Sequence, residues 1–255
     1  MNLTEIRSFI QSLAEESGRI ILAHYLDPNL EVEYKVDETP VTLADREAEL
    51  LIRERIEKKF PEHGIVGEEH GSTRADAEYV WLLDPIDGTK SFLSGVPLFG
   101  TLICLKRAGE PIFGAIHQPV LKQLMIGDNS QTTLNGKPMV MRKPTGGLAG
   151  ASILTTDERN ARNRFGLKTW TKLTDQACFV RTWGDCYGYL LLASGKADVM
   201  IDPIVNSWDF HVMIPIIRGA GGRITDHQGE NPLEGNSVVA SHPELHDGII
   251  RLLGN

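Results

Sequence analysis

The period of the hydrophobic pattern changes along the chain, and this change restricts the folds that the chain can adopt. Apolar residues recur at helical spacing from Leu3 to about Leu26, and a second helix is predicted from Thr42 to Phe60, ending before Pro61. The apolar runs between residues 64 and 127 are short and broken by glycine and proline, as in strands. Two helices followed by a run of strands indicate an α+β layer.

A second pattern begins after a stretch rich in glycine, proline and threonine at residues 142–150, where we place a soft boundary. Beyond it, strand and helix patterns alternate, which is typical of an α/β layer. Strands are predicted at residues 178–182, 197–202, 222–226 and 237–241, and helices at 187–194, at 208–220 and at the end up to Leu253. We therefore predict an N-terminal layer over residues 1–145 and a C-terminal layer over residues 146–255.

Composition argues against several classes of protein. With 41% hydrophobic and 24% charged residues, the chain is composed like a soluble globular protein. A formal net charge of −8 argues against nucleic-acid binding and mildly favours a positively charged substrate. No apolar run is as long as a membrane span, and early acidic residues argue against a signal peptide. Three cysteines without metal-ligand spacing indicate free thiols, so we expect a cytoplasmic protein.

The sequence DPIDGT places two carboxylates at the end of an apolar run. Pro85 cannot donate a hydrogen bond to a sheet, so we expect the strand to stop there and turn. In such a turn Asp84, Asp87 and the carbonyl of Ile86 can face the same place. Two close carboxylates repel each other unless a cation lies between them, and oxygen ligands at this density suit Mg²⁺.

Gly88 and Thr89 follow the second aspartate and are expected to begin a new element. Backbone N–H groups at the start of a helix form an anion site, so a phosphate can lie beside the metal. The structural alternative is an ordinary solvated turn or helix cap, because a pair of aspartates three apart is common in both. Spacing alone does not decide between the two.

Other acidic residues also have structural interpretations that spacing leaves open. Glu68 and Glu69 can belong to a charged loop, and the neighbouring His70 is interpreted as a surface residue. Asp45 ends the sequence TLAD, which fits a capping box at the start of a helix. Asp209 can favour a helix N-terminus through the helix dipole. Asp209 lies far from the DPIDGT motif in the sequence, and no spacing rule joins them.

Three motifs together resemble the inositol monophosphatase family of Mg²⁺-dependent, lithium-sensitive phosphatases. They are GEEHG at residues 67–71, WLLDPIDGTKSFLSGVPLFGTLI at 81–103 and WDFHVMIPIIRGAGGRITD at 208–226. The resemblance covers nearly the whole chain and implies the layered α/β/α/β/α sandwich of this family, commonly a homodimer. It also implies a phosphate monoester hydrolase that uses two or three Mg²⁺ ions and that lithium can inhibit.

The resemblance implies a role for each candidate residue. The family positions that hold the metal ions match Glu68, Asp84, the carbonyl of Ile86, Asp87 and Asp209. The positions that activate the attacking water match Asp45 and Thr89. Together with the metal ligand Glu68, these two are the predicted catalytic residues. The predicted substrate-binding residues are Gly88, Thr89, Asp185 and Lys35, the last from a segment thought to shield the site, EYKVDETPVT at residues 33–42.

Substrate choice within the family is expected to depend on residues 181–199. Inositol-type members typically have small neutral residues after the glycine of this segment, whereas the sequence GDCYGY places Asp185 there. This difference, together with TPVT upstream, resembles the histidinol-phosphate phosphatase branch. A carboxylate can pair with the ammonium or the imidazole of histidinol phosphate, whereas inositol offers only hydroxyls. The structural alternative is that Asp185 caps the helix at residues 187–194.

The main alternative function is an inositol-1-phosphate phosphatase of broad specificity. A protein that keeps the fold and only binds or regulates is a remote alternative, because every expected metal-ligand position holds the required residue type. A nucleotide 3′-phosphatase lacks a supporting basic or aromatic cluster. We therefore expect a small phosphate ester as the partner, with no nucleic acid and no membrane.

Overall fold

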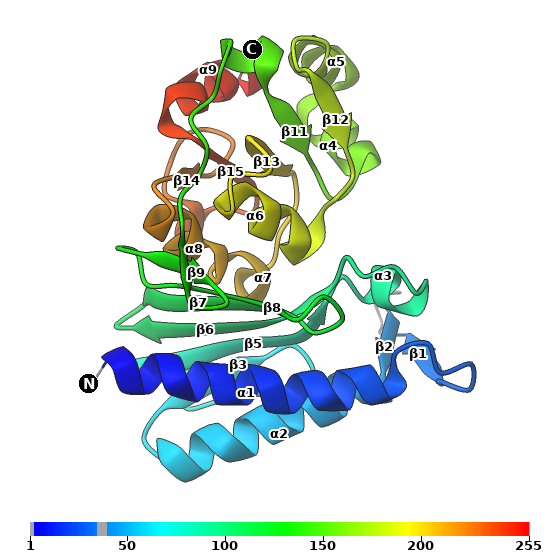
Figure 1. Cartoon of the computed structure of the whole chain (residues 1–255), viewed down its shortest axis with the longest axis vertical. Coiled ribbons are helices and arrows are strands. Elements are labelled where there is room, and N and C mark those ends of the chain that lie inside the picture. Colours follow the sequence, from blue (N-terminus) through cyan, green and yellow to red (C-terminus); the bar gives the residue numbers. More distant parts are fainter. Residues whose placement is uncertain (1–2, 35–39, 255) are drawn as a thin grey trace.

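The computed structural model describes residues 3–34 and 40–254, which form alternating layers of helices and sheets (Figure 1). The helices are α1 (Leu3–His24), α2 (Leu43–Lys59), α3 (Thr89–Leu93), α4 (Glu158–Phe165), α5 (Leu167–Thr174), α6 (Asp185–Ala193), α7 (Ser207–Phe210), α8 (Met213–Gly219) and α9 (Pro243–Leu253). Two short 3₁₀ helices are η1 (Gly147–Gly150) and η2 (Pro232–Glu234).

Strands from the two halves of the chain form separate sheets. The strands are β1 (Val32–Tyr34), β2 (Pro40–Thr42), β3 (Gly64–Gly67), β4 (Gly71–Thr73), β5 (Tyr79–Asp87), β6 (Gly100–Arg107), β7 (Glu110–Gln118), β8 (Gln123–Gly127), β9 (Thr132–Leu134), β10 (Lys137–Met139), β11 (Ser152–Leu154), β12 (Phe179–Arg181), β13 (Val199–Asp202), β14 (Arg223–Thr225) and β15 (Val238–Ser241). Among the described residues, one sheet has the order β10-β9-β8-β7-β6-β5-β3-β4 and the other β12-β11-β13-β15-β14. A small antiparallel pair, β1 and β2, lies apart from both.

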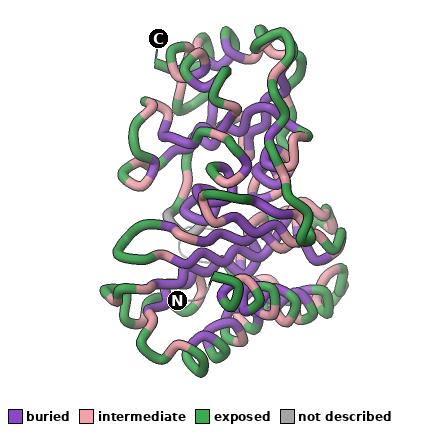
Figure 2. Tube along the Cα trace, turned by 60° about the vertical axis from the view of Figure 1, so that its left-hand side comes forward, coloured by how far each residue is buried: buried purple, intermediate pink, exposed green. Residues whose placement is uncertain are grey.

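The sheets and helices stack as five layers, and this confirms the predicted α/β/α/β/α fold. Helices α1 and α2 cover one face of the first sheet, and α6, α7 and α8 lie between the two sheets. Helices α4, α5 and α9 cover the far face of the second sheet (Figure 1). Figure 2 shows the result: the long strands β5, β6 and β7 are mostly buried, whereas the short edge strands β4, β10 and β12 and the outer helices and loops carry many exposed residues.

Each interface between layers has its own hydrophobic core. Ile10 of α1 and Ile52 of α2 pack with Trp81 of β5 beneath the first sheet. The larger core lies between the sheets and combines residues of both halves, such as Leu102 of β6 and Met213 of α8. The boundary predicted at residues 145 and 146 falls in the connection from β10 to β11, which is mostly exposed to solvent. The division into two domains stays a prediction, because the two halves share this core.

Helix α8 lies directly on strands β7 and β8, since glycine stands at the points of contact. A Cβ atom on Gly114 would lie 2.0 Å from the Val212 carbonyl oxygen, and one on Gly127 would lie 2.4 Å from the Ile216 Cα. Such distances are far below van der Waals contact, so a larger residue at either position would push the helix away from the sheet. This close approach fixes α8, and with it the preceding helix α7, above the sheet.

The single helix predicted over residues 208–220 is wrong in one respect, because the structure has two helices there. Helix α7 ends at Phe210 and α8 begins at Met213. Pro215 has no backbone N–H to bond the carbonyl of His211, so an unbroken helix through this point would lose a hydrogen bond. In α8 the proline instead occupies the first turn, where an N–H has no partner within the helix.

Two predictions about the whole chain can be compared with the described residues. None of the helices described in residues 3–34 and 40–254 has the length and apolar character of a membrane span. The three cysteines are free thiols, as predicted, with Cys104 and Cys186 buried and Cys178 exposed.

Candidate metal centre and active site

Strand β5 carries the first two acidic residues of the site. We expected this strand to stop at Pro85, but it continues to Asp87. Asp84 lies opposite Leu102 and Asp87 lies opposite Gly100, so the register shifts by one residue between the two pairs. Such a bulge allows a strand to contain a proline, which has no N–H to donate to the adjacent strand. The bulge also changes the direction of the side chains around it. The prediction of a turn was therefore wrong, although an irregularity does lie at the proline.

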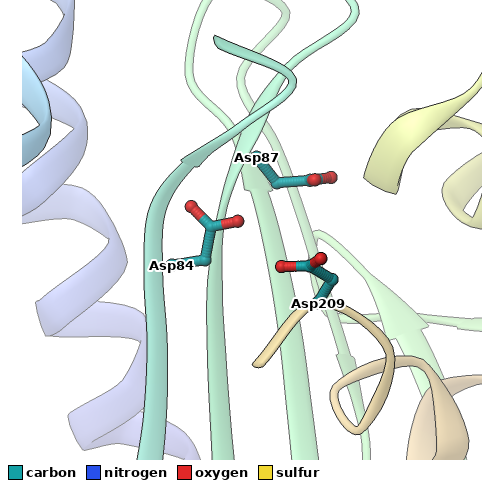
Figure 3. Close-up of side chains that lie close together, drawn as sticks. All are labelled: Asp84, Asp87 and Asp209. Atoms are coloured by element: carbon teal, nitrogen blue, oxygen red, sulfur yellow. The ribbon is translucent and has the colours of Figure 1, made fainter. Parts of the chain in front are cut away.

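Helix α7 brings a third carboxylate to the end of β5 (Figure 3). Asp84, Asp87 and Asp209 each offer an oxygen, and these three oxygens all lie within 4.8 Å of one another. Asp84 is only 2% exposed, and it lies on the sheet side of the cluster. Three carboxylate oxygens at this separation form a ligand set for a hard divalent cation. The structure thus joins Asp209 to the DPIDGT motif, which sequence spacing could not do.

The raised pKa values of these three aspartates show that their charged forms are unfavourable without a cation. Burial raises the pKa of Asp84 well above its ordinary value, and the nearby Glu68 and Asp87 raise it further. Burial raises the pKa of Asp87 as well, and the charge of Asp185 is the next largest cause of the rise. The hydrogen bond that the Cys186 N–H donates to the Asp87 carboxylate has the opposite effect and lowers this pKa. Burial and Glu68 raise the pKa of Asp209 to about 7. A bound cation would remove this repulsion and restore the charged carboxylates.

Glu68 lies at the end of β3, next to this cluster. Its backbone N–H donates to the carbonyl of Leu83, the residue before Asp84, at 3.1 Å. Its charge raises the pKa of Asp84, of Asp209 and of Asp45, each after the larger effect of burial. Glu68 is not one of the three carboxylates that lie within 4.8 Å of one another, so its role as a metal ligand stays a prediction.

Asp45 makes the capping contact predicted from TLAD. Its Oδ2 accepts hydrogen bonds from the Thr42 backbone N–H at 2.8 Å and from the Thr42 hydroxyl at 2.6 Å. Burial raises the pKa of Asp45 to about 6, and the Thr42 bonds oppose that rise. Both bonds use the same carboxylate oxygen, so the cap leaves Oδ1 for another partner. The capping and catalytic interpretations of Asp45 are therefore compatible.

The turn after β5 is the place of the predicted phosphate cradle, and it requires glycine. Gly88 has φ of +85°, and a Cβ atom there would lie 2.8 Å from the Leu98 carbonyl oxygen. Glycine is therefore required twice, for conformation and for space. The Thr89 hydroxyl donates to the Ile86 carbonyl at 3.0 Å. The hydroxyl proton of Thr89 is thus not directed at Asp45, and the predicted pairing of these two residues stays a prediction.

A small pocket of about 80 Å³ opens beside the cluster of Asp84, Asp87 and Asp209, called the metal cluster below. Four aspartates line it together with a buried tyrosine and apolar residues; its acidic members are Asp87, Asp185, Asp202 and Asp209. The Asp202 carboxylate accepts a hydrogen bond from the Tyr189 hydroxyl at 2.7 Å and one from the Thr156 N–H at 3.1 Å. Asp202 was not among the residues predicted from the sequence, although it ends the apolar strand β13 just as Asp84 follows an apolar run in β5.

Asp185 lies between this pocket and Gly88, a residue of the predicted phosphate cradle. A Cβ atom on Gly88 would lie 3.2 Å from its Oδ2. The residue has φ of +49°, an uncommon conformation that aspartate tolerates, and its N–H donates to the Thr156 hydroxyl at 2.8 Å. Burial and then the charge of Asp202 raise the pKa of Asp185 to about 7, while Lys90 opposes that shift.

The suggestion that Asp185 only caps a helix is not supported. The N-cap of α6 is Gly184, and within the described residues the helix start has no side-chain capping hydrogen bond. The predicted surface position of His70 is confirmed, since it is exposed. Lys35, predicted to shield the site, lies outside the described residues.

Comparison with known proteins agrees with this geometry. The model of the inositol monophosphatase family matches residues 2–255. The chain belongs to this family. A histidinol-phosphatase of Chlorobaculum parvum is 37% identical over 245 residues, 95% of this chain and 94% of its own. An inositol-1-monophosphatase of Caulobacter vibrioides is 28% identical over 97% of each chain. A solved inositol monophosphatase structure from Zymomonas mobilis superposes with a TM-score of 0.88, at 32% identity and full coverage of both chains.

The acidic cluster of this inositol monophosphatase family member predicts a pH-dependent response to Mg²⁺. An unfolded aspartate has a pKa of about 3.9, whereas Asp209 and Asp185 have values raised to about 7 in the folded chain. Between these pH values the folded state keeps protons that the unfolded state has released. These two groups therefore contribute a loss of stability to the metal-free protein as pH rises from about 4 to about 7.

We expect Mg²⁺ to raise the melting temperature more at about pH 8 than at about pH 5, because the ligands must be deprotonated to bind it. Thermal denaturation with Mg²⁺ or with EDTA, at matched ionic strength, measures this difference. An equal rise at both pH values, or no rise, would contradict a metal site built from these carboxylates.

Proposed function

We propose that the chain is a Mg²⁺-dependent phosphatase that hydrolyses L-histidinol phosphate to L-histidinol and phosphate. The observation that supports it most is the acidic pocket that joins the metal cluster to Asp185 and Asp202. Family membership supports hydrolysis of a phosphate monoester, since the relatives named above are phosphatases. The relative named histidinol-phosphatase is more similar to this chain, at 37%, than the inositol-1-monophosphatase, at 28%.

The residues present fit divalent metal ions, since clustered buried carboxylates need a cation to stay charged. The groups that would hold Mg²⁺ are Glu68, Asp84, the Ile86 carbonyl, Asp87 and Asp209. Bound Mg²⁺ would neutralise phosphoryl charge and make water more acidic. We further propose two or three ions and inhibition by lithium, both on the basis of the family resemblance.

The other groups would position the reactants. The buried Asp45 carboxylate would accept a proton from the attacking water through Oδ1, the oxygen that the cap leaves, and Thr89 is proposed to orient that water. The N–H groups of Gly88 and Thr89 would donate to the phosphate, because the left-handed turn at Gly88 precedes a helix start. Phosphoryl transfer depends mainly on such positioning and on electrostatic stabilisation.

The alcohol part of the substrate would lie against Asp185 and Asp202. Histidinol carries an ammonium group and an imidazole, so it can present two cationic or hydrogen-bonding groups to two carboxylates. A neutral polyol would leave the partly buried Asp185 carboxylate without a cationic partner, and this is costly. The pocket therefore favours a cationic alcohol. Lys35, which falls outside the described residues, is proposed to take part in substrate binding on the basis of the family resemblance alone.

The assignment predicts a selective effect of Asp185→Ser. We expect kcat/KM for histidinol phosphate to fall by roughly 10- to 100-fold, about 1.4–2.8 kcal/mol, as for loss of a charged hydrogen bond. Activity on glycerol 2-phosphate should change far less, because this ester has no cation and the metal ligands are intact. Steady-state kinetics on both esters measures the contrast.

Asp175→Ser is a matched control, because Asp175 is an exposed aspartate after α5, outside the pocket. It should leave both rates unchanged. Equal losses on both esters in Asp185→Ser would show general damage and remove the support for this role. A wild-type preference for inositol 1-phosphate would instead favour the inositol-1-phosphate phosphatase of broad specificity.

The setting of the enzyme is also part of the proposal. We propose a homodimer, as is common in the family, acting in the cytoplasm on a small phosphate ester. The net charge of −8 is unfavourable for nucleic acid as a partner.

A further inference from the structure

Glu49 of α2 is a fully buried carboxylate that the proposed reaction does not use. Its side chain is 0% exposed. The Arg53 Nε donates to its Oε1 at 2.7 Å, the His70 N–H donates to the same oxygen at 3.0 Å, and the Glu69 N–H donates to Oε2 at 2.8 Å. A buried charge is tolerated only with a partner and several donors, and here two of the donors are backbone groups of one loop.

The pair of Glu49 and Arg53 holds this loop at three consecutive residues. Besides its bond to Glu49, Arg53 donates from its terminal nitrogen to the carbonyl of Gly71. The loop residues Glu69 and His70 are held by the carboxylate, and Gly71 is held by the guanidinium. All three follow Glu68 directly, so the backbone on the C-terminal side of Glu68 is fixed to α2.

The residue before Glu68 is adapted to the same carboxylate. A Cβ atom on Gly67 would lie 2.1 Å from Glu49 Oε1. Gly67 does not have the positive φ that itself calls for glycine, so space for Glu49 is what excludes a larger residue. Glu49 thus contacts the chain on both sides of Glu68.

One face of α2 carries Glu49 and Arg53 together with Asp45, the proposed proton acceptor. Asp45, Glu49 and Arg53 are spaced four residues apart, which places them in a row on a helix. All three are buried. The Glu68 N–H donates to the carbonyl of Leu83, the residue before Asp84, at 3.1 Å. The same helix therefore carries Asp45 and, through Glu49 and Arg53, holds the loop that follows Glu68.

We propose that Glu49 is a positioning residue that, together with Arg53, holds the loop after β3 so that the Glu68 carboxylate faces Asp84 and Asp209. It acts on the metal centre through hydrogen bonds to the Glu69 and His70 amides and touches neither substrate nor metal. This inference rests on the proposed metal-binding role of Glu68.

The test replaces Glu49 by glutamine, which has nearly the same shape but carries no charge. Its NH2 group donates hydrogen bonds where one carboxylate oxygen of Glu49 accepts them. In the metal-free full-length protein, hydrogen exchange at the Glu69 and His70 amides should become faster. Calorimetric titration with Mg²⁺ alone should show affinity weakened by roughly 10- to 100-fold, the usual effect of removing a group that orients a metal ligand. Neither readout requires turnover.

Asp198→Asn is the matched control, because Asp198 is also a buried carboxylate that binds an arginine and a backbone amide. It is 3% exposed and accepts from the Arg142 Nε at 2.6 Å and the Ser152 N–H at 2.7 Å. This variant should lower the melting temperature without altering loop exchange or Mg²⁺ affinity. Arg53→Lys, which keeps the charge but loses the forked reach to Gly71, should weaken Mg²⁺ binding in the same direction as Glu49→Gln.

The outcomes separate this inference from the proposed function. If Glu49→Gln binds Mg²⁺ as wild type does, or if Asp198→Asn weakens binding equally, Glu49 has no specific positioning role. If Glu49→Gln fails to fold, unchanged Mg²⁺ affinity in Arg53→Lys overturns the inference. If wild type itself fails to bind Mg²⁺, the proposed metal site is wrong, and the inference falls with it.

Discussion

Asp87→Asn is expected to lower the rate of phosphate release by at least about 100-fold, in line with the loss of a metal ligand or of electrostatic catalysis. The side chain lies in the cluster with Asp84 and Asp209, so its charge serves the cation more than the fold. Asparagine keeps an oxygen that can accept from the Cys186 N–H. Steady-state assays in saturating Mg²⁺ measure the loss.

The same substitution should not destabilise the metal-free protein. Asp87 has a pKa raised by burial and by its acidic neighbours, so a neutral side chain removes repulsion at about pH 8. Asp226→Ala provides the opposite case, because the buried Asp226 carboxylate lies outside the group Asp84, Asp87 and Asp209 and accepts from the N–H groups of Gln228 and Glu230, both at 2.8 Å. Alanine leaves both N–H groups without this acceptor. That variant should lose stability and keep its rate. Near wild-type turnover of Asp87→Asn would contradict the proposed role of Asp87.

Asp45→Asn distinguishes a helix cap from a proton acceptor. Asparagine caps helices as well as aspartate does, and its amide oxygen can accept from the Thr42 N–H, so the melting temperature should stay close to that of wild type. An amide cannot take a proton from water, so the rate should fall by about 100-fold or more, as for loss of a general base. The experiment measures the melting temperature and kcat of Asp45→Asn and of wild type in the same Mg²⁺ buffer.

A control comes from the N-cap of α4. The Asp157 side chain accepts from the N–H groups of Arg159 and Asn160, at 2.7 and 3.0 Å, and lies outside the acidic cluster. Asp157→Asn should therefore change neither rate nor stability by much. If Asp45→Asn behaves in the same way, Asp45 is only a cap.

Local patterns predicted the elements whose burial follows one regular period. Helices α1 and α2, the long strands β5, β6 and β7, and the α/β character of the second half follow from such patterns. Helix α4 gave no such signal, because only Ala161 among its residues is buried. Its one local mark is Asp157 as N-cap, a cue that is too common to define a helix by itself.

The site was predictable only as far as residues close in sequence could show it. The pair Asp84 and Asp87 lies in one motif, so its clustering could be predicted from spacing, although the bulged path of the strand could not. Asp209 reaches the cluster because α8 lies flat on Gly114 and Gly127, a contact between layers that spacing does not contain. Asp202 became visible only when the pocket placed it beside Asp185.

The exposed connection from β10 to β11 has a consequence for the integrity of the chain. Residues 142–150 are accessible to solvent, and such segments are where proteases most readily cut. The core between the sheets is built jointly by the two halves, through residues such as Leu102 and Met213. The peptide link across this segment is therefore not what holds the halves together. A nicked molecule would stay assembled as a noncovalent complex of two fragments, with Asp209 still facing the aspartates of the other fragment.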